Sequence, residues 1–131
     1  MTETRSVAVA LVDALRELGV RYVFGVPSGG WVDYMEALRA ADGIEFILTT
    51  HESGAGMMAE VCGRLGGAPG VCFGTFGPGA TNLATGVGEA LLDRSAMIAL
   101  TDEMPAAMRG RRAASGGFRG LGSLCVELSA S

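Results

Sequence analysis

Glu52 is the residue in this sequence that is best placed for acid–base chemistry. It follows an apolar run at residues 44–50 that has strand character, and it precedes a small-residue run at residues 53–67 that has helix character. In open α/β folds, ligands bind at the edge of the sheet formed by the carboxyl ends of parallel strands. We therefore expect Glu52 to be the chemical residue and the neighbouring elements to present it.

Other side chains with chemical potential are few. His51 is the only histidine, so an HExxH zinc site is excluded despite the His51-Glu52 pair. The three cysteines, Cys62, Cys72 and Cys125, form no CxxC pair, which is typical of a reduced, cytoplasmic protein with free thiols. A Cys–His nucleophile would have to use His51, and a buried Cys is more often a small apolar residue. All ten basic residues are Arg, which excludes lysine-dependent catalysis and the Walker P-loop.

Composition limits the class of protein. A chain of 131 residues with 49% hydrophobic residues is expected to form one globular domain. No apolar run approaches the roughly 18 residues of a membrane helix, and the first residues lack a signal-peptide layout. The net charge of -4 argues against nucleic acid as a partner, in spite of three arginines at positions 109, 111 and 112.

Helical and strand patterns alternate along residues 6–101. Strands are expected at residues 21–26, 44–50, 71–75 and 96–101, and helices at residues 6–18, 31–41, 53–67 and 80–93. This order predicts an α/β fold with three α/β/α layers and a mostly parallel sheet of at least four strands, with helices on both faces. Right-handed crossovers then bring all four strand-end loops to one edge of the sheet.

Apolar and small residues indicate which helix faces are buried. The expected inward faces of the first and last helices are Val7, Leu11, Leu15 and Leu18, and Leu83, Val87, Ala90 and Leu91. Trp31 and Tyr34 fit core packing better than ligand stacking. The helix after Glu52 carries a nearly bare face, which allows another helix or a flat ligand to pack closely. This face consists of Gly54, Ala55, Gly56 and Ala59.

Four motifs, in this order and spacing, resemble one enzyme family. They are LGVRYVFGVP at residues 18–27, HESGA at residues 51–55, GVC at residues 70–72 and GPGATN at residues 77–82. Residues 6–105 resemble the N-terminal pyrimidine-binding domain of thiamine diphosphate-dependent enzymes, in particular the acetolactate synthase-like group.

The resemblance implies a role for each matching residue. A glutamate at the position of Glu52 hydrogen-bonds a pyrimidine ring nitrogen of the cofactor and promotes the imino tautomer that generates the thiazolium ylid. Pro78 and Asn82 belong to a turn that contacts the pyrimidine, and Val26 and Pro27 belong to a loop near the same ring. Burial would raise the pKa of a carboxyl used in this way, whereas the start of a helix would favour its charged form, and the sequence leaves the balance open.

The sequence also departs from this group. It lacks the Gly-Asp-Gly…Asn motif that binds Mg²⁺ in the diphosphate-binding domain, and Asp102-Glu103 stands where Gly-Gln is usual. We expect residues 1–107 to form an incomplete pyrimidine-binding domain and residues 108–131 to form a loose, divergent tail. Taken alone, the turn at residues 77–82 could also bind an anion or another ring at the start of a helix.

Two functions follow from these observations. In the first, the chain is the pyrimidine-binding half of a 2-oxo acid decarboxylase or carboligase. Such a lyase or transferase would be active only with a separate subunit that binds the diphosphate and Mg²⁺. In the second, the chain is a truncated, non-catalytic remnant or an interaction module. A stand-alone binder of another small ring is a third idea. A functional form is expected to be a homo- or hetero-oligomer, with the small-residue face of the helix after Glu52 at the interface.

Overall fold

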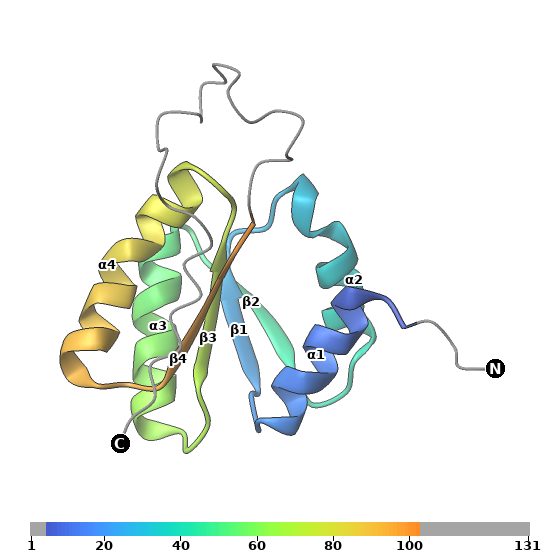
Figure 1. Ribbon diagram of the computed structural model, residues 1–131, viewed down its shortest axis with the longest axis horizontal. Helices are drawn as coiled ribbons and strands as arrows, with labels where there is room; N and C mark the ends of the chain where they lie inside the picture. Colours follow the sequence, from blue (N-terminus) through green and yellow to red (C-terminus); the bar gives the residue numbers. More distant parts are fainter. Residues whose placement is uncertain (1–4, 103–131) are drawn as a thin grey trace.

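The computed structural model describes residues 5–102. Helices and strands alternate throughout this part of the chain (Figure 1). The elements are α1 (Val7–Glu17), β1 (Tyr22–Gly25), the 3₁₀ turn η1 (Gly29–Trp31), α2 (Val32–Ala40), β2 (Glu45–Leu48), α3 (Glu52–Leu65), β3 (Gly70–Gly74), α4 (Pro78–Asp93) and β4 (Met97–Thr101).

The four described strands form one parallel sheet in the order β2-β1-β3-β4. Their ends agree to within one residue: Gly25 pairs with Leu48 and with Phe73, and Gly74, the last residue of β3, pairs with Thr101. All four strands therefore end at the same edge, which is the upper edge in Figure 1. The predicted three-layer α/β/α fold with a parallel sheet is confirmed.

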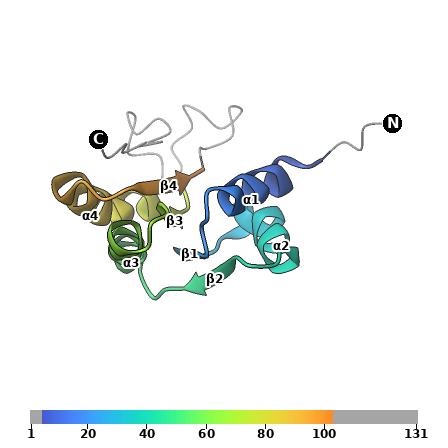
Figure 2. The same ribbon diagram turned by 90° about the horizontal axis from the view of Figure 1, so that it is seen from below.

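Alternation along the strands divides the interior into two cores. Val71 and Phe73 of β3 lie in the core beneath α1 and α2, whereas Cys72 between them lies in the core beneath α3 and α4. Figure 2 shows the two helix pairs on opposite sides of the sheet. Because successive side chains of a strand point to opposite faces, one buried strand serves both cores.

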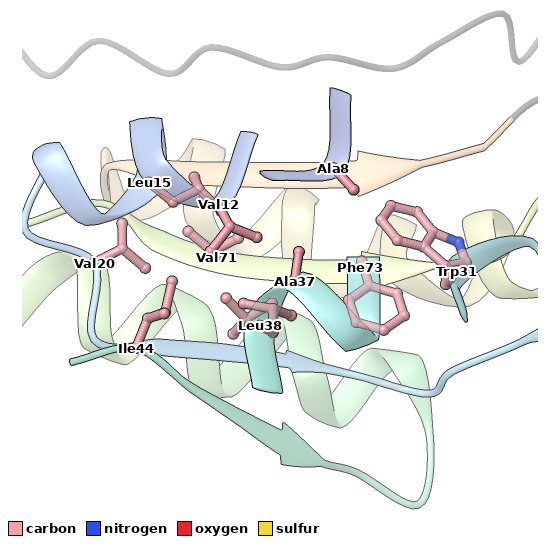
Figure 3. Close-up of a cluster of buried hydrophobic side chains, with 11 residues drawn as sticks. Ala8, Val12, Leu15, Val20, Trp31, Ala37, Leu38, Ile44, Val71 and Phe73 are labelled. Carbon is pink, nitrogen blue, oxygen red and sulfur yellow. The ribbon is translucent and has the colours of Figure 1, made fainter. Parts of the chain in front are cut away.

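Large side chains fill the core beneath α1 and α2 (Figure 3). The Phe73 ring stacks on Trp31, with the ring centroids 4.5 Å apart, and on Phe46, with the centroids 5.5 Å apart. Trp31 is buried in η1, immediately before α2. The expectation that Trp31 packs in the core rather than against a ligand agrees with these contacts.

Small residues fill the contact between α3 and α4. A Cβ on Gly86 would lie 2.6 Å from the Cα of Gly56, so the two helix backbones touch. Ala55 and Ala59 are fully buried against the sheet. The sequence predicted this close packing, but the expectation that the small-residue face lies at a subunit interface is wrong for Ala55, Gly56 and Ala59, because the chain's own sheet and α4 cover it.

Two further expectations about helix faces are corrected. Val7 and Leu18 are exposed, since α1 turns Ala8, Val12 and Leu15 toward the sheet. Leu91 is also exposed, and Ala90 takes the inward position near the end of α4. Within residues 5–102, no helix is long and apolar enough to span a membrane.

Candidate functional site at the carboxyl edge of the sheet

Glu52 is the first residue of α3 and lies just beyond the end of β2. The Thr49 N–H donates to the carbonyl of Gly25, which extends the parallel pairing past the last residue of β2. His51 then caps the helix: its Nδ1 atom accepts the N–H of Ser53 at 3.2 Å. These local bonds direct the Glu52 side chain inward, where only 9% of the residue is exposed.

The Glu52 carboxylate is held between two segments of the chain. The Asn82 side-chain amide donates to Oε2 of Glu52 at 2.9 Å. Gly74 and Gly79 leave room for the acid, because a Cβ on Gly74 would lie 3.1 Å from its Cγ and a Cβ on Gly79 would lie 3.2 Å from its Oε1. Within residues 5–102, Oε1 accepts no hydrogen bond.

The turn that delivers Asn82 depends on a glycine and a proline. Gly77 has a φ of 72°, which favours glycine because it has no Cβ. Pro78 follows as the first residue of α4, where its missing N–H leaves no helical hydrogen bond unmade. The Ala80 N–H donates to Thr75 O at 2.8 Å and closes the turn. Helix α4 therefore starts at Pro78, two residues earlier than the sequence predicted.

A second hydrogen bond joins α3 and α4 near their N-terminal ends. The Ser53 hydroxyl donates to the backbone carbonyl of Asn82 at 2.7 Å. Ser53 is not among the site residues predicted from the sequence. Its position directly after Glu52 is the signal that was available, because a short hydroxyl in the first turn of a helix can reach a neighbouring backbone.

Asp102 has a structural role that sequence reasoning missed. It was noted only as a departure from the usual Gly-Gln pair; its partner Glu103 lies outside the described residues. The Asp102 Oδ1 atom accepts the Phe76 N–H at 2.5 Å, and the Thr75 hydroxyl donates to Oδ2 at 3.4 Å. Asp102 thus joins the end of β4 to the loop after β3.

Val26 and Pro27 follow β1 at the same edge of the sheet. Val26 is half-buried and Pro27 is exposed. Pro27 lines a groove of about 840 Å³ between α2 and β2, together with Val32, Met35 and Phe46. No hydrogen bond among the described residues joins Val26 or Pro27 to Glu52 or Asn82. The structure brings Glu52, Asn82 and the Pro78 turn together, and it places Val26 and Pro27 at the same edge of the sheet.

Other reactive groups lie apart from this pair. Burial raises the pKa of the Cys72 thiol to about 12, so it is a protonated thiol near neutral pH. His51 is exposed and its Nδ1 atom is engaged in capping α3. Residues 5–102 contain no group of three or more His, Cys, Asp or Glu side chains arranged to hold a metal ion.

Sequence comparison identifies the family. A family model described as "Thiamine pyrophosphate enzyme, N-terminal TPP binding domain" matches residues 5–121. The chain belongs to this family. The resemblance inferred from the four motifs is thereby confirmed. The match to this N-terminal TPP binding domain covers all the described residues and part of the expected tail, so the boundary at residue 107 stays a prediction.

Several relatives of this TPP binding domain carry one name. The chain is 41% identical over 108 residues to "Acetolactate synthase, chloroplastic" of Arabidopsis thaliana, covering 82% of this chain and 16% of that protein. It is 40% identical over 100 residues to "Acetolactate synthase isozyme 1 large subunit" of Escherichia coli, covering 76% of this chain and 18% of that protein. A probable acetolactate synthase large subunit of Methanocaldococcus jannaschii is 42% identical over 106 residues, with 81% and 18% coverage. The chain thus spans less than a fifth of the length of these relatives.

Proposed function

We propose that Glu52 binds the aminopyrimidine ring of thiamine diphosphate, and that this chain is the pyrimidine-binding half of a 2-oxo acid decarboxylase or carboligase. One observation carries the proposal: a nearly buried carboxylate is fixed through Oε2 by Asn82, while Oε1 has no donor among residues 5–102. A ring nitrogen that shares a proton is a suitable partner for Oε1.

The residues around Glu52 fit a flat ring. Gly74 and Gly79 present backbone instead of side chain beside the carboxylate. Asn82 limits the rotation of Glu52, which favours one orientation of the acid. We assign Pro78 to the rigid wall of this site and Val26 and Pro27 to the neighbouring loop. When bound, the cofactor would act as an electron sink that stabilises negative charge at the former carbonyl carbon of the substrate.

Activity is proposed to need more than this chain. The relatives are more than five times longer than the matched region. We propose that a diphosphate-binding domain or subunit provides the Mg²⁺ site, that the substrate is a 2-oxo acid and that the working form is an oligomer. Cys62 and Cys72 are unpaired in the described chain, which supports a cytoplasmic location.

The test compares two buried glutamates of α3. Glu52 and Glu60 are 9% and 3% exposed, and Glu60 bonds Ser95 and Arg64 at the other end of the helix. In NMR titrations of the full chain with thiamine diphosphate and Mg²⁺, we expect shifts at Glu52, Gly79 and Asn82. Loss of the hydrogen bond to a charged group should weaken binding about tenfold or more in Glu52→Gln. Glu60→Gln should bind like the native chain.

The alternative function makes the opposite prediction. If the chain is a non-catalytic remnant or an interaction module, millimolar cofactor will leave the resonances at the carboxyl edge unchanged. Equal binding by the native chain and Glu52→Gln would remove the assigned role from Glu52 even if the cofactor binds elsewhere.

A further inference from the structure

Asp102 connects three of the four loops at the carboxyl edge. Its Oδ1 accepts the Phe76 N–H and its Oδ2 accepts the Thr75 hydroxyl, both in the loop after β3. A Cβ added to Gly30, in the loop after β1, would lie 2.7 Å from Oδ2. The carboxylate therefore occupies space that is open only because residue 30 is a glycine.

We propose that Asp102 is a positioning residue that fixes the turn at residues 76–82 and, through it, the Asn82–Glu52 hydrogen bond. The consequence for cofactor binding rests on the function proposed above. The consequence for the turn itself does not, because it concerns bonds within this chain.

The turn at residues 76–82 needs hydrogen bonds to a neighbouring element to fix its direction, and the two bonds accepted by Asp102 are called the tie below. Its own bonds, from Ala80 N–H to Thr75 O and from Thr81 N–H to Gly77 O, close the turn onto itself. They do not fix its direction relative to the sheet. The bonds from Asp102 join residues 75 and 76 to the end of β4, the strand paired with β3. A carboxylate that accepts a backbone N–H makes one of the stronger hydrogen bonds in proteins.

The tie and the candidate site lie at the two ends of one short segment. Asp102 holds Phe76, the turn passes through Gly77 and Pro78, and Asn82 then donates to Glu52. Release of Phe76 removes the side-chain restraint at the start of this segment, while the Ser53 hydroxyl still donates to the Asn82 carbonyl. We therefore expect the Asn82 amide to lose its fixed position on Oε2 of Glu52.

Four variants separate this role from general stability. Asp102→Ala removes both acceptor oxygens, and Asp102→Asn keeps one acceptor for the Phe76 N–H. Gly30→Ala leaves Asp102 in place but displaces its carboxylate, which as the end of a flexible side chain can move without unfolding the chain. Asp42→Ala, at an exposed position between α2 and β2, serves as the control.

The measurement is amide hydrogen exchange by NMR on the full chain, together with the shifts of the Asn82 side-chain amide. We expect the Phe76 amide to exchange about tenfold faster or more in Asp102→Ala and Gly30→Ala. Asp102→Asn should stay within about threefold of the native rate, and Asp42→Ala should match it. The Asn82 side-chain signals should move in Asp102→Ala and Gly30→Ala, and not in Asp102→Asn or Asp42→Ala.

Each outcome decides the matter. Unchanged exchange at Phe76 in Asp102→Ala would overturn the tie, and faster exchange with unmoved Asn82 signals would overturn its effect on the site. If Asp102→Ala does not fold, Gly30→Ala and Asp102→Asn give the same comparison. A titration with thiamine diphosphate and Mg²⁺ separates the two proposals: a native chain that does not bind contradicts the proposed function, while the exchange and Asn82 signals still decide the role of Asp102.

Discussion

The two faces of the sheet are packed by different means. Beneath α1 and α2, large rings and branched side chains fill the space, with Phe73 between Trp31 and Phe46. Beneath α3 and α4 the backbones themselves meet: a Cβ on Gly70 would overlap the carbonyl oxygen of Ala59, and Gly56 touches Gly86. Side chains separate the sheet from α1 and α2, whereas α3 touches the sheet backbone at Gly70 and the α4 backbone at Gly86, beside a second set of buried side chains.

The candidate site lies on the face where backbones touch. Glu52 and Asn82 lie near the N-terminal ends of α3 and α4, the two helices that touch at Gly56 and Gly86. Side chains can change rotamer, whereas touching backbones leave little room for adjustment. A carboxylate that must meet a ligand in one orientation gains from such support. The face beneath α1 and α2 needs only bulk, so the same accuracy is not required there.

The largest effect is expected from emptying the large-residue core. Phe73→Ala should lower the free energy of unfolding by about 3–5 kcal/mol, since the removed ring leaves a cavity between Trp31 and Phe46. Cys72→Ala, at the next position and on the opposite face, should cost about 1 kcal/mol because it removes one atom. Urea denaturation of both variants measures the difference. Equal losses would contradict the contrast between the faces.

The next prediction has a smaller expected effect on stability, and it adds a methyl group to α4 instead of removing a side chain. Gly86→Ala should destabilise the chain by about 1–3 kcal/mol, because the new Cβ would press on the backbone of Gly56. Gly88→Ala is the matched control: nothing lies within 4 Å of the added Cβ, and Ala favours a helix over Gly by about 0.5–1 kcal/mol. Thermal unfolding should therefore shift in opposite directions. A shift in the same direction would show that α3 and α4 are not in backbone contact.

The elements could be predicted from the sequence because their signals are local. Short apolar runs and helical patterns located the four α-helices and four strands within residues 5–102, and parallel connections placed Glu52, Pro78 and Asn82 at one edge. The N-terminal boundaries were less accurate. Helix α4 begins with Pro78, which the sequence analysis assigned to the turn, since a proline after glycine fits both a turn and a first helical residue.

The pairings within the site could not be predicted in the same way. Asn82 and Glu52 are 30 positions apart, and the sequence indicated only that both face a ligand, not that one donates to the other. The sequence marked Asp102 only as a departure from the usual Gly-Gln pair, whereas its carboxylate accepts hydrogen bonds from a backbone N–H and a hydroxyl of the adjacent loop. Such bonds depend on distances of a few ångströms between loops, which no local pattern encodes.

The smallest expected effect distinguishes the faces most directly, since it changes one helix cap on each. Ser6 caps α1 by accepting the Val9 N–H at 3.3 Å, and His51 caps α3 by accepting the Ser53 N–H at 3.2 Å. Ser6→Ala and His51→Ala should each lower the free energy of unfolding by about 0.5–2 kcal/mol, and His51→Asn should retain most of the native stability.

The two losses of stability are similar, but their consequences for the site differ. Loosening the first turn of α1 leaves the site unaffected, whereas loosening that of α3 frees Glu52, so the Asn82 side-chain amide signals should move in His51→Ala alone. Movement in both variants, or in neither, would show that the position of Glu52 does not depend on the start of α3.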